Sequence, residues 1–163
     1  MFRIGDIISY RTAGVCRVED IRPESLTGEK KEYYILKPVA RNGATVYVPR
    51  DNELLCSRMT ALLTRTAADT IVKKPQRTEP TWVENAKERQ AAFTAIINSG
   101  EREEIAGIIR ALFRHKKEVA EQGHKFYASD ERLLAAAQKA VVGELAYVLE
   151  WEEADVVAAL CKE

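Results

Sequence analysis

Residues 2–49 read FRIGDIISYRTAGVCRVEDIRPESLTGEKKEYYILKPVARNGATVYVP. Short runs of β-branched and aromatic residues alternate here with turn residues at near-regular intervals, and helical periodicity is absent. This pattern predicts a small, strongly bent antiparallel barrel. Four strands in so short a segment make a marginal core, so the barrel is expected to need support from the rest of the chain or from a partner.

The barrel segment divides into four predicted strands. Their expected ranges are residues 6–10, 15–21, 31–37 and 44–48. Ile21 falls out of the inward and outward alternation of the second strand, which predicts a bulge or a bend there. Asn42-Gly43 is a strong hairpin signal just before the fourth strand.

Beyond Pro49 the pattern changes from strand to helix. Residues 54–63 are predicted to form a short helix. The predicted domains are a barrel (1–60), a short helix with a linker (61–80) and a helical domain (81–163). The expected fold class is α+β, with a Tudor/SH3-like antiparallel barrel followed by an all-α domain.

The helical domain opens on a capping signal. Thr81 and Glu84 have the spacing of a capping box, which predicts a helix that starts there and ends at Gly100. Trp82 then lies in the first turn of that helix, one residue after the cap.

Three more helices are expected after Gly100. The first carries an apolar stripe formed by Ile105, Ile108, Ile109, Leu112 and Phe113. Ser129 or Asp130 is predicted to cap the next helix, and residues 152–161 form the last. Trp151, in an acidic setting, is expected to pack this last helix.

Composition bounds the class of protein. The chain has 163 residues, of which 46% are hydrophobic and 31% charged, as in a soluble domain, and no apolar run is long enough to span a membrane. The start of the chain lacks a signal-peptide layout, so a cytoplasmic protein without membrane contact is expected. Cys16, Cys56 and Cys161 show no metal-ligand spacing, and neither do His115 and His124, so no metal or other cofactor is expected.

Net charge is zero, but the charge is unevenly distributed. Residues 71–117 contain ten Lys or Arg against six acidic residues, whereas residues 118–163 contain four against ten. Charge acts locally, so the basic middle segment is compatible with nucleic-acid binding, although solvated helices often carry such mixtures.

The chain shows no recognisable catalytic motif. It has no phosphate-binding Gly loop, no HExxH motif and no nucleophile elbow, so it is not expected to be an enzyme. Trp82 is the most distinctive single residue, because cations lie on both sides of it in sequence. It is either a nucleic-acid contact or a staple that packs the linker onto the helices, and the residue pattern leaves both interpretations open.

A set of residues, in the same order as in a known family, runs through both halves of the chain. In the barrel the set is Gly5-Asp6, Tyr10, Gly14, Val18, Gly28-Glu29, Lys31-Glu32-Tyr33, Leu36-Lys37, Thr45-Val46 and Val48-Pro49. In the helical half it is Glu79-Pro80-Thr81, Trp82, Ser99-Gly100, Arg114 and Val142-Gly143-Glu144-Leu145. Together they resemble the CarD/CdnL family of bacterial transcription regulators. The barrel also resembles the polymerase-binding module of transcription-repair coupling factors, whose motor motifs are absent here.

The resemblance implies a partner for each half of the chain. The barrel is expected to dock on the β subunit of RNA polymerase by pairing an edge strand, here residues 44–48. The polymerase-binding residues implied are Arg22, Glu24, Thr45, Val46, Tyr47, Pro49 and Arg50. The helical domain is expected to contact the promoter DNA minor groove, largely independently of sequence, at the upstream edge of the −10 bubble. Trp82 would act there as a wedge that stabilises the open complex.

The remaining DNA contacts are expected from basic side chains. The DNA-binding residues implied are Trp82, Lys87, Arg89, Arg114, Lys116 and Arg132. Better-known members of the family carry basic residues where this chain has Glu84 and Glu131. Fewer phosphate contacts would weaken DNA binding and flatten its salt dependence. An adaptor that binds polymerase, and whose helical domain contacts another protein, is the alternative; a monomer is expected in either case.

Overall fold

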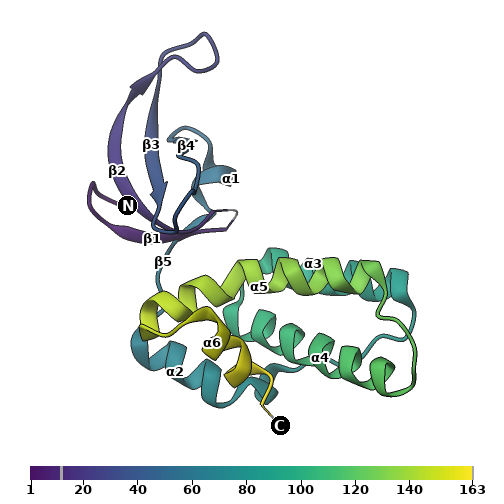
Figure 1. Ribbon diagram of the computed structural model, residues 1–163. Coiled ribbons are helices and arrows are strands. Elements are labelled where there is room, and N and C mark those ends of the chain that lie inside the picture. Colours follow the sequence, from purple (N-terminus) through teal and green to yellow (C-terminus); the bar gives the residue numbers. More distant parts are fainter. Residues whose placement is uncertain (12, 163) are drawn as a thin grey trace. The chain divides into compact units, whose positions relative to one another are not determined.

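The computed structural model describes residues 1–11 and 13–162, without the side chains of Gln76 and Arg77. The chain forms two compact units, Met1–Leu62 and Leu63–Glu163 (Figure 1). The first contains an antiparallel sheet and the second is helical, so the predicted α+β class, with a β domain followed by a helical domain, is confirmed. No helix among the described residues is both long and apolar enough to cross a membrane.

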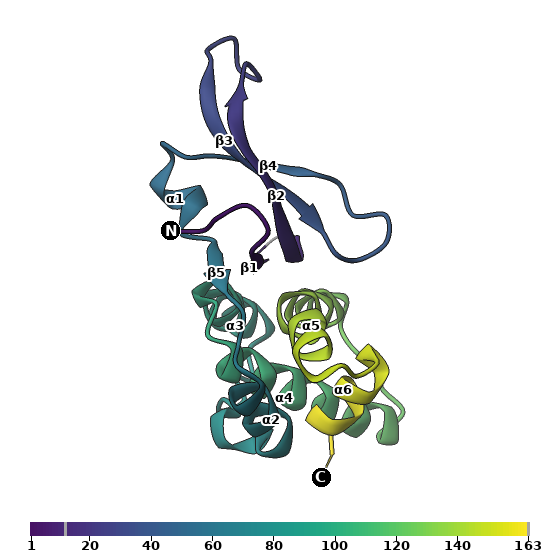
Figure 2. The same ribbon diagram turned by 90° about the vertical axis from the view of Figure 1, so that its left-hand side faces the viewer.

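The β unit is a five-stranded antiparallel sheet with the order β4-β3-β2-β1-β5. The strands are β1 (Ile7–Tyr10), β2 (Gly14–Glu24), β3 (Lys31–Pro38), β4 (Val46–Pro49) and β5 (Met59–Ala61). The long strands β2 and β3 form the extended hairpin seen in Figure 2. Their register shifts between Val18 and Asp20, which confirms the predicted irregularity near Ile21.

The core of the β unit lies on one face of the sheet. Eight buried residues form it: Ile8, Tyr10, Cys16, Val18, Tyr34, Leu36, Val48 and Met59. Met59 explains why the helix predicted over residues 54–63 is wrong. Only α1 (Glu53–Cys56) is helical there, because Met59 pairs with Tyr10 and carries the chain into β5. A strand of this length is too short to show a period-2 pattern.

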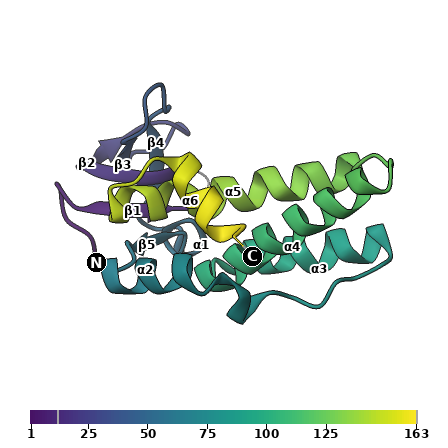
Figure 3. The same cartoon turned by 60° about the horizontal axis from the view of Figure 1, so that its bottom comes forward.

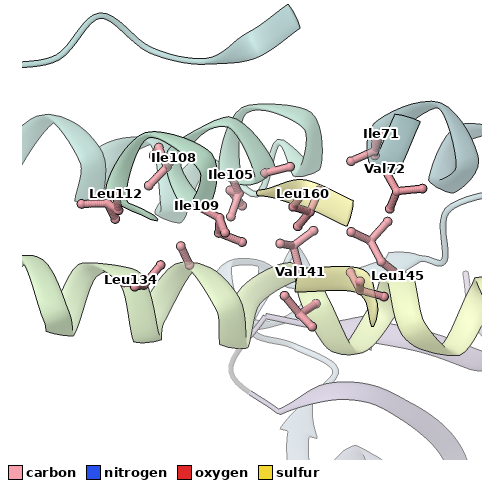
Figure 4. Close-up of a cluster of buried hydrophobic side chains, with 14 of the residues drawn as sticks. Ile71, Val72, Ile105, Ile108, Ile109, Leu112, Leu134, Val141, Leu145 and Leu160 are labelled. Atoms are coloured by element: carbon pink, nitrogen blue, oxygen red, sulfur yellow. The ribbon is translucent and has the colours of Figure 1, made fainter. Parts of the chain in front are cut away.

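The helical unit contains α2 (Arg65–Lys73), the 3-10 turn η1 (Pro75–Thr78), α3 (Ala86–Ser99), α4 (Arg102–Glu121), α5 (Ala128–Leu149) and α6 (Glu153–Leu160). Its core gathers between these helices (Figure 4). The stripe predicted on α4 is buried except for Phe113, which is partly exposed. Ile71 and Val72 of α2 belong to the same core, so this helix, in the segment predicted as a short helix with a linker, is packed into the helical unit.

Two helix starts differ from the prediction. α3 begins after Asn85, whose side chain accepts a hydrogen bond from the backbone N–H of Glu88 at 3.0 Å, so Trp82 precedes the helix rather than occupying its first turn. The N-cap of α5 is Tyr127, and it makes no side-chain cap bond. The predicted end of α3 is confirmed, because the helix stops at Ser99 and Gly100 adopts the left-handed conformation, with φ 77°.

A buried carboxylate ties the start of the helical unit to α5. Glu144 accepts hydrogen bonds from the backbone N–H of Leu63 at 3.0 Å and from Arg102 Nε and Nη2 at 3.0 and 3.1 Å. The ion pair between Arg102 and Glu144 is bidentate, and Arg102 lies at the beginning of α4.

Candidate functional site

Residues 79–85 form an extended segment between η1 and α3, which we call the strap (Figure 3). Side chains attach it to α4. The hydroxyl of Thr78, just before the strap, donates to the carbonyl of Glu103 at 2.5 Å. Further along, Glu79 accepts from Arg110 Nε at 3.1 Å and from Arg114 Nη2 at 2.5 Å. The strap therefore follows the surface of α4 toward its C-terminal half.

Trp82 lies at the middle of the strap against an aromatic group. Its ring centroid is 4.1 Å from that of His115, with an interplanar angle of 30°. Phe93 of α3 meets it edge-on, with the centroids 5.9 Å apart. The indole is partly buried and packs on the helical core. Trp82 is thus a staple by its packing, while part of its surface remains exposed.

Arg89 does not fit the prediction that it contacts DNA. Its side chain is only 2% exposed, and its Nε and Nη2 atoms bind the two carboxylate oxygens of Asp130 at 2.8 and 2.7 Å. Its Nη1 atom donates to the carbonyls of Val83 and Glu84 at 2.8 and 3.1 Å. Asp130 was also expected as a helix cap, and instead its carboxylate serves as the partner of Arg89.

The other predicted cations are exposed to different degrees. Lys87 on α3 and Arg132 on α5 are exposed. Arg114 is half exposed, although it binds Glu79. Lys116 is 43% exposed and binds both carboxylate oxygens of Glu131, at 2.9 and 3.3 Å. That ion pair links α4 to the first turn of α5, so Glu131 neutralises the charge of Lys116.

Contacts between rings place several of these residues at one end of the helical unit. His115, which contacts Trp82, also lies 6.0 Å from Phe126 in the loop before α5. The ammonium of Lys116 is 5.6 Å from the same Phe126 ring. The loop also exposes Lys125 and Tyr127, which the sequence pattern does not single out. Their only local signal is an aromatic beside a lysine after Gly123, and it is the fold that brings the intervening Phe126 against His115.

The predicted docking strand is an edge of the sheet. β4 pairs only with β3 among the described strands, in the register Ile35 opposite Tyr47. The backbone N–H of Arg50 points toward β3, since it donates to the carbonyl of Glu32 at 2.9 Å. By alternation, the N–H and C=O of Tyr47 point to the free side. Pro49, two residues on, has no N–H to offer there.

Side chains on this edge form a partly exposed surface. Tyr47 is 39% exposed and meets Tyr33 edge-on, with centroids 6.4 Å apart. Val46 is partly exposed, and Thr45, just before β4, is exposed. Arg50 binds Glu32 at 2.8 Å and lies 5.3 Å from the ring centroid of Tyr34.

Arg22 and Glu24 on β2 bind each other. Arg22 Nε lies 2.7 Å from the Glu24 carboxylate, and its Nη1 lies 3.2 Å from that of Asp20. Hydrogen bonding to Glu24 and then Asp20 raises the pKa of the Arg22 guanidinium. The arginine therefore stays charged, and a partner's carboxylate would have to compete with two local ones.

Two other features bear on function. Within residues 1–11 and 13–162, no group of three or more His, Cys, Asp or Glu side chains is placed to hold a metal ion. Trp151 is 40% exposed and shares a surface depression with Ala159 of α6, so its packing on the last helix stays a prediction. It borders an open depression together with Lys73 and Arg110.

Comparisons with known proteins agree with the division into two units. A family model described as "CarD-like/TRCF RID domain" matches residues 2–59, and one described as "CarD, C-terminal domain" matches residues 69–161. A Bacillus subtilis (strain 168) protein, named "Putative transcription factor YdeB", is 31% identical over 145 residues. The similarity covers 89% of this chain and 90% of that protein.

Proposed function

This chain belongs to the CarD family of transcription factors, and from that membership we infer that it holds RNA polymerase with one unit and promoter DNA with the other. The β unit docks on the polymerase β subunit through the free edge of β4. The helical unit contacts the DNA minor groove at the upstream edge of the −10 bubble and stabilises the open complex. The protein acts as a monomer in the cytoplasm, at the nucleoid.

The observation that carries the DNA-binding proposal is the way Trp82 is supported. The flat indole of Trp82 projects from an extended segment and packs against His115 and Phe93. Part of its surface is exposed. An apolar ring of this kind can occupy a partly unstacked base step. The exposed cations Lys87 on α3 and Arg132 on α5 suit phosphate.

The energy required of this contact is small. A regulator that binds the open state better than the closed state by about 1.4 kcal/mol shifts their ratio tenfold. No bond has to be made or broken, so such a role needs no catalytic group.

The free edge of β4 supports polymerase docking. The N–H and C=O of Tyr47 are directed away from β3, and the exposed Tyr47 ring lies beside them. An added strand from a partner would satisfy these backbone groups, while the alternate side chains would select the partner.

A footprint of a purified polymerase–promoter complex tests this function. With the chain bound, protection is expected to extend at the upstream edge of the −10 region, and the polymerase β subunit is expected to crosslink to residues near Tyr47. An unchanged DNA footprint, with crosslinks to polymerase retained, would overturn the DNA part of the proposal.

The adaptor function is supported by the acidic substitutions near Trp82. Glu84 is exposed on the strap, and Glu131 neutralises Lys116. If the helical unit contacts a protein, an added duplex or open-junction DNA should not bind the isolated chain at low salt, where phosphate contacts are strongest.

A further inference from the structure

We propose that Arg89, held by Asp130, is the positioning residue that fixes how the strap presents Trp82. The proposal deepens the function above, and only its consequence for DNA rests on that function. The orientation of the indole can be tested without any DNA.

The first ground is how the backbone hydrogen-bonding groups of the strap are satisfied. Between described residues, no backbone–backbone hydrogen bond involves residues 79–84. The two carbonyls that follow Trp82, those of Val83 and Glu84, accept from a single side-chain atom, Arg89 Nη1. The path of the chain immediately after the indole therefore depends on one guanidinium.

The second ground is direct contact with the ring. The guanidinium carbon of Arg89 is 4.6 Å from the centroid of the Trp82 ring. Because Arg89 is almost fully buried, this cation–π attraction acts in a largely desolvated setting, where it is strongest. The same group thus contacts the indole and the backbone that carries it.

The third ground is the way Asp130 orients the guanidinium. Asp130 is fully buried in the first turn of α5, and its two oxygens meet Nε and Nη2 side by side. This fork fixes the plane of the guanidinium and leaves Nη1 directed at the strap. A lysine ammonium has neither the planar fork nor the reach to serve the carboxylate and two carbonyls together.

Positioning matters because a Trp82 side chain that is already held in its binding orientation loses less conformational entropy when it binds. A buried ion pair also has a purely structural role, since breaking one destabilises a fold wherever it lies. The two roles separate when Arg89 is compared with a second bidentate pair in the same unit. Arg102 and Glu144 form such a pair at the start of α4, roughly 20 Å along the helix from His115.

The experiment uses the full chain with Trp151→Phe, so that Trp82 is the only tryptophan. Arg89→Lys is compared with Arg102→Lys, and each is measured for thermal unfolding, Trp82 emission and acrylamide quenching, polymerase binding and open-complex lifetime. Asp130→Asn is nearly isosteric and also weakens the hold on the Arg89 guanidinium. It replaces Arg89→Lys as the test if that variant does not fold.

Arg89→Lys and Asp130→Asn are expected to increase quenching of Trp82 and to shorten the open-complex lifetime several-fold. Arg102→Lys is expected to lower the unfolding temperature while leaving both of these readouts near the parent values. Unchanged quenching in folded Arg89→Lys or Asp130→Asn protein would overturn the proposal, and so would equal quenching in Arg102→Lys.

Trp82→Ala distinguishes this failure from failure of the proposed function. If Trp82→Ala leaves the lifetime unchanged, the DNA function fails, and the quenching data alone decide whether Arg89 positions the indole. If Trp82→Ala shortens the lifetime but Arg89→Lys and Asp130→Asn do not, the positioning role fails while the DNA function stands.

Discussion

The carbonyl oxygen of Thr78 lies so close to Gly107 that a Cβ atom on Gly107 would collide with it. That Cβ would also lie 3.0 Å from the Cα atom of Glu79. The chain therefore enters the strap in direct contact with the backbone of α4, at a site where only glycine fits. This close approach brings Glu79 within reach of Arg110 and Arg114.

Gly107→Ala is expected to destabilise the helical unit by about 1–3 kcal/mol, the usual cost of overpacking, because the obstacle is backbone rather than a flexible side chain. Gly143→Ala is the matched control, since a Cβ there meets only the Glu153 carboxylate at 3.7 Å. That change should be neutral or stabilise by up to about 1 kcal/mol, as alanine favours helix. Urea unfolding of both variants checks this, and equal stabilities would contradict the close approach.

Glu131→Lys is expected to strengthen DNA binding. It releases Lys116 from its ion pair and adds a cation beside it. Each added phosphate contact steepens the dependence of log affinity on log salt by about 0.9. Anisotropy titrations of an open-junction DNA at several salt concentrations measure the slope. Glu150→Lys changes the charge equally at the other end of α5, and the same steepening there would argue against a local contact.

Tyr47→Ala is expected to weaken polymerase binding, because it removes the exposed ring from the free edge of β4. Tyr147→Ala removes a tyrosine of similar exposure from the helical unit and should leave this binding unchanged. Pull-down with purified polymerase compares them. Normal binding by Tyr47→Ala would place the docking surface elsewhere.

Cys16 is expected to make the β unit sensitive to alkali. Burial raises the pKa of its thiol from 9.0 to about 11. Between these values the unfolded chain loses the proton and the folded chain keeps it, so stability falls as pH rises from about 9 to 11. Cys16→Ala should be less stable at pH 8 but should lose less over that interval. Urea midpoints from the methyl NMR signals of Val18 and Leu36, measured across this pH range, test this. Equal losses of stability in Cys16→Ala and the unmodified chain would refute it.

The sequence predicts the parts of the fold that depend on local patterns. The stripe of α4 and the irregularity of β2 follow from side-chain period, and Gly100 follows from backbone conformation. The predicted start of α3 is wrong because two cap signals compete. Thr81 with Glu84 and Asn85 with Glu88 have the same spacing, and the second is used, since the strap before it is bound to α4 through Glu79.

The candidate site is less predictable because its key contacts join distant parts of the chain. Asp130 looks like a helix cap and Arg89 looks like a surface cation when each is read with its neighbours. Their pairing across α3 and α5 reverses both interpretations. His115 carries no sequence signal for stacking on Trp82. Trp82 itself is predictable from its flanking cations, although the residue pattern leaves both of its roles open.

The most direct test of the central claim is the dissociation rate of open promoter complexes formed with Trp82→Ala. Because the indole is only partly buried, its loss should cost less than the roughly 3–5 kcal/mol of a core tryptophan, and the variant should remain folded. Trp151→Ala, which removes an exposed indole elsewhere in the helical unit, is the control. We predict that Trp82→Ala binds polymerase normally and shortens the open-complex lifetime several-fold, whereas Trp151→Ala does not. A lifetime equal to that of the unmodified chain, with polymerase binding intact, would contradict the account.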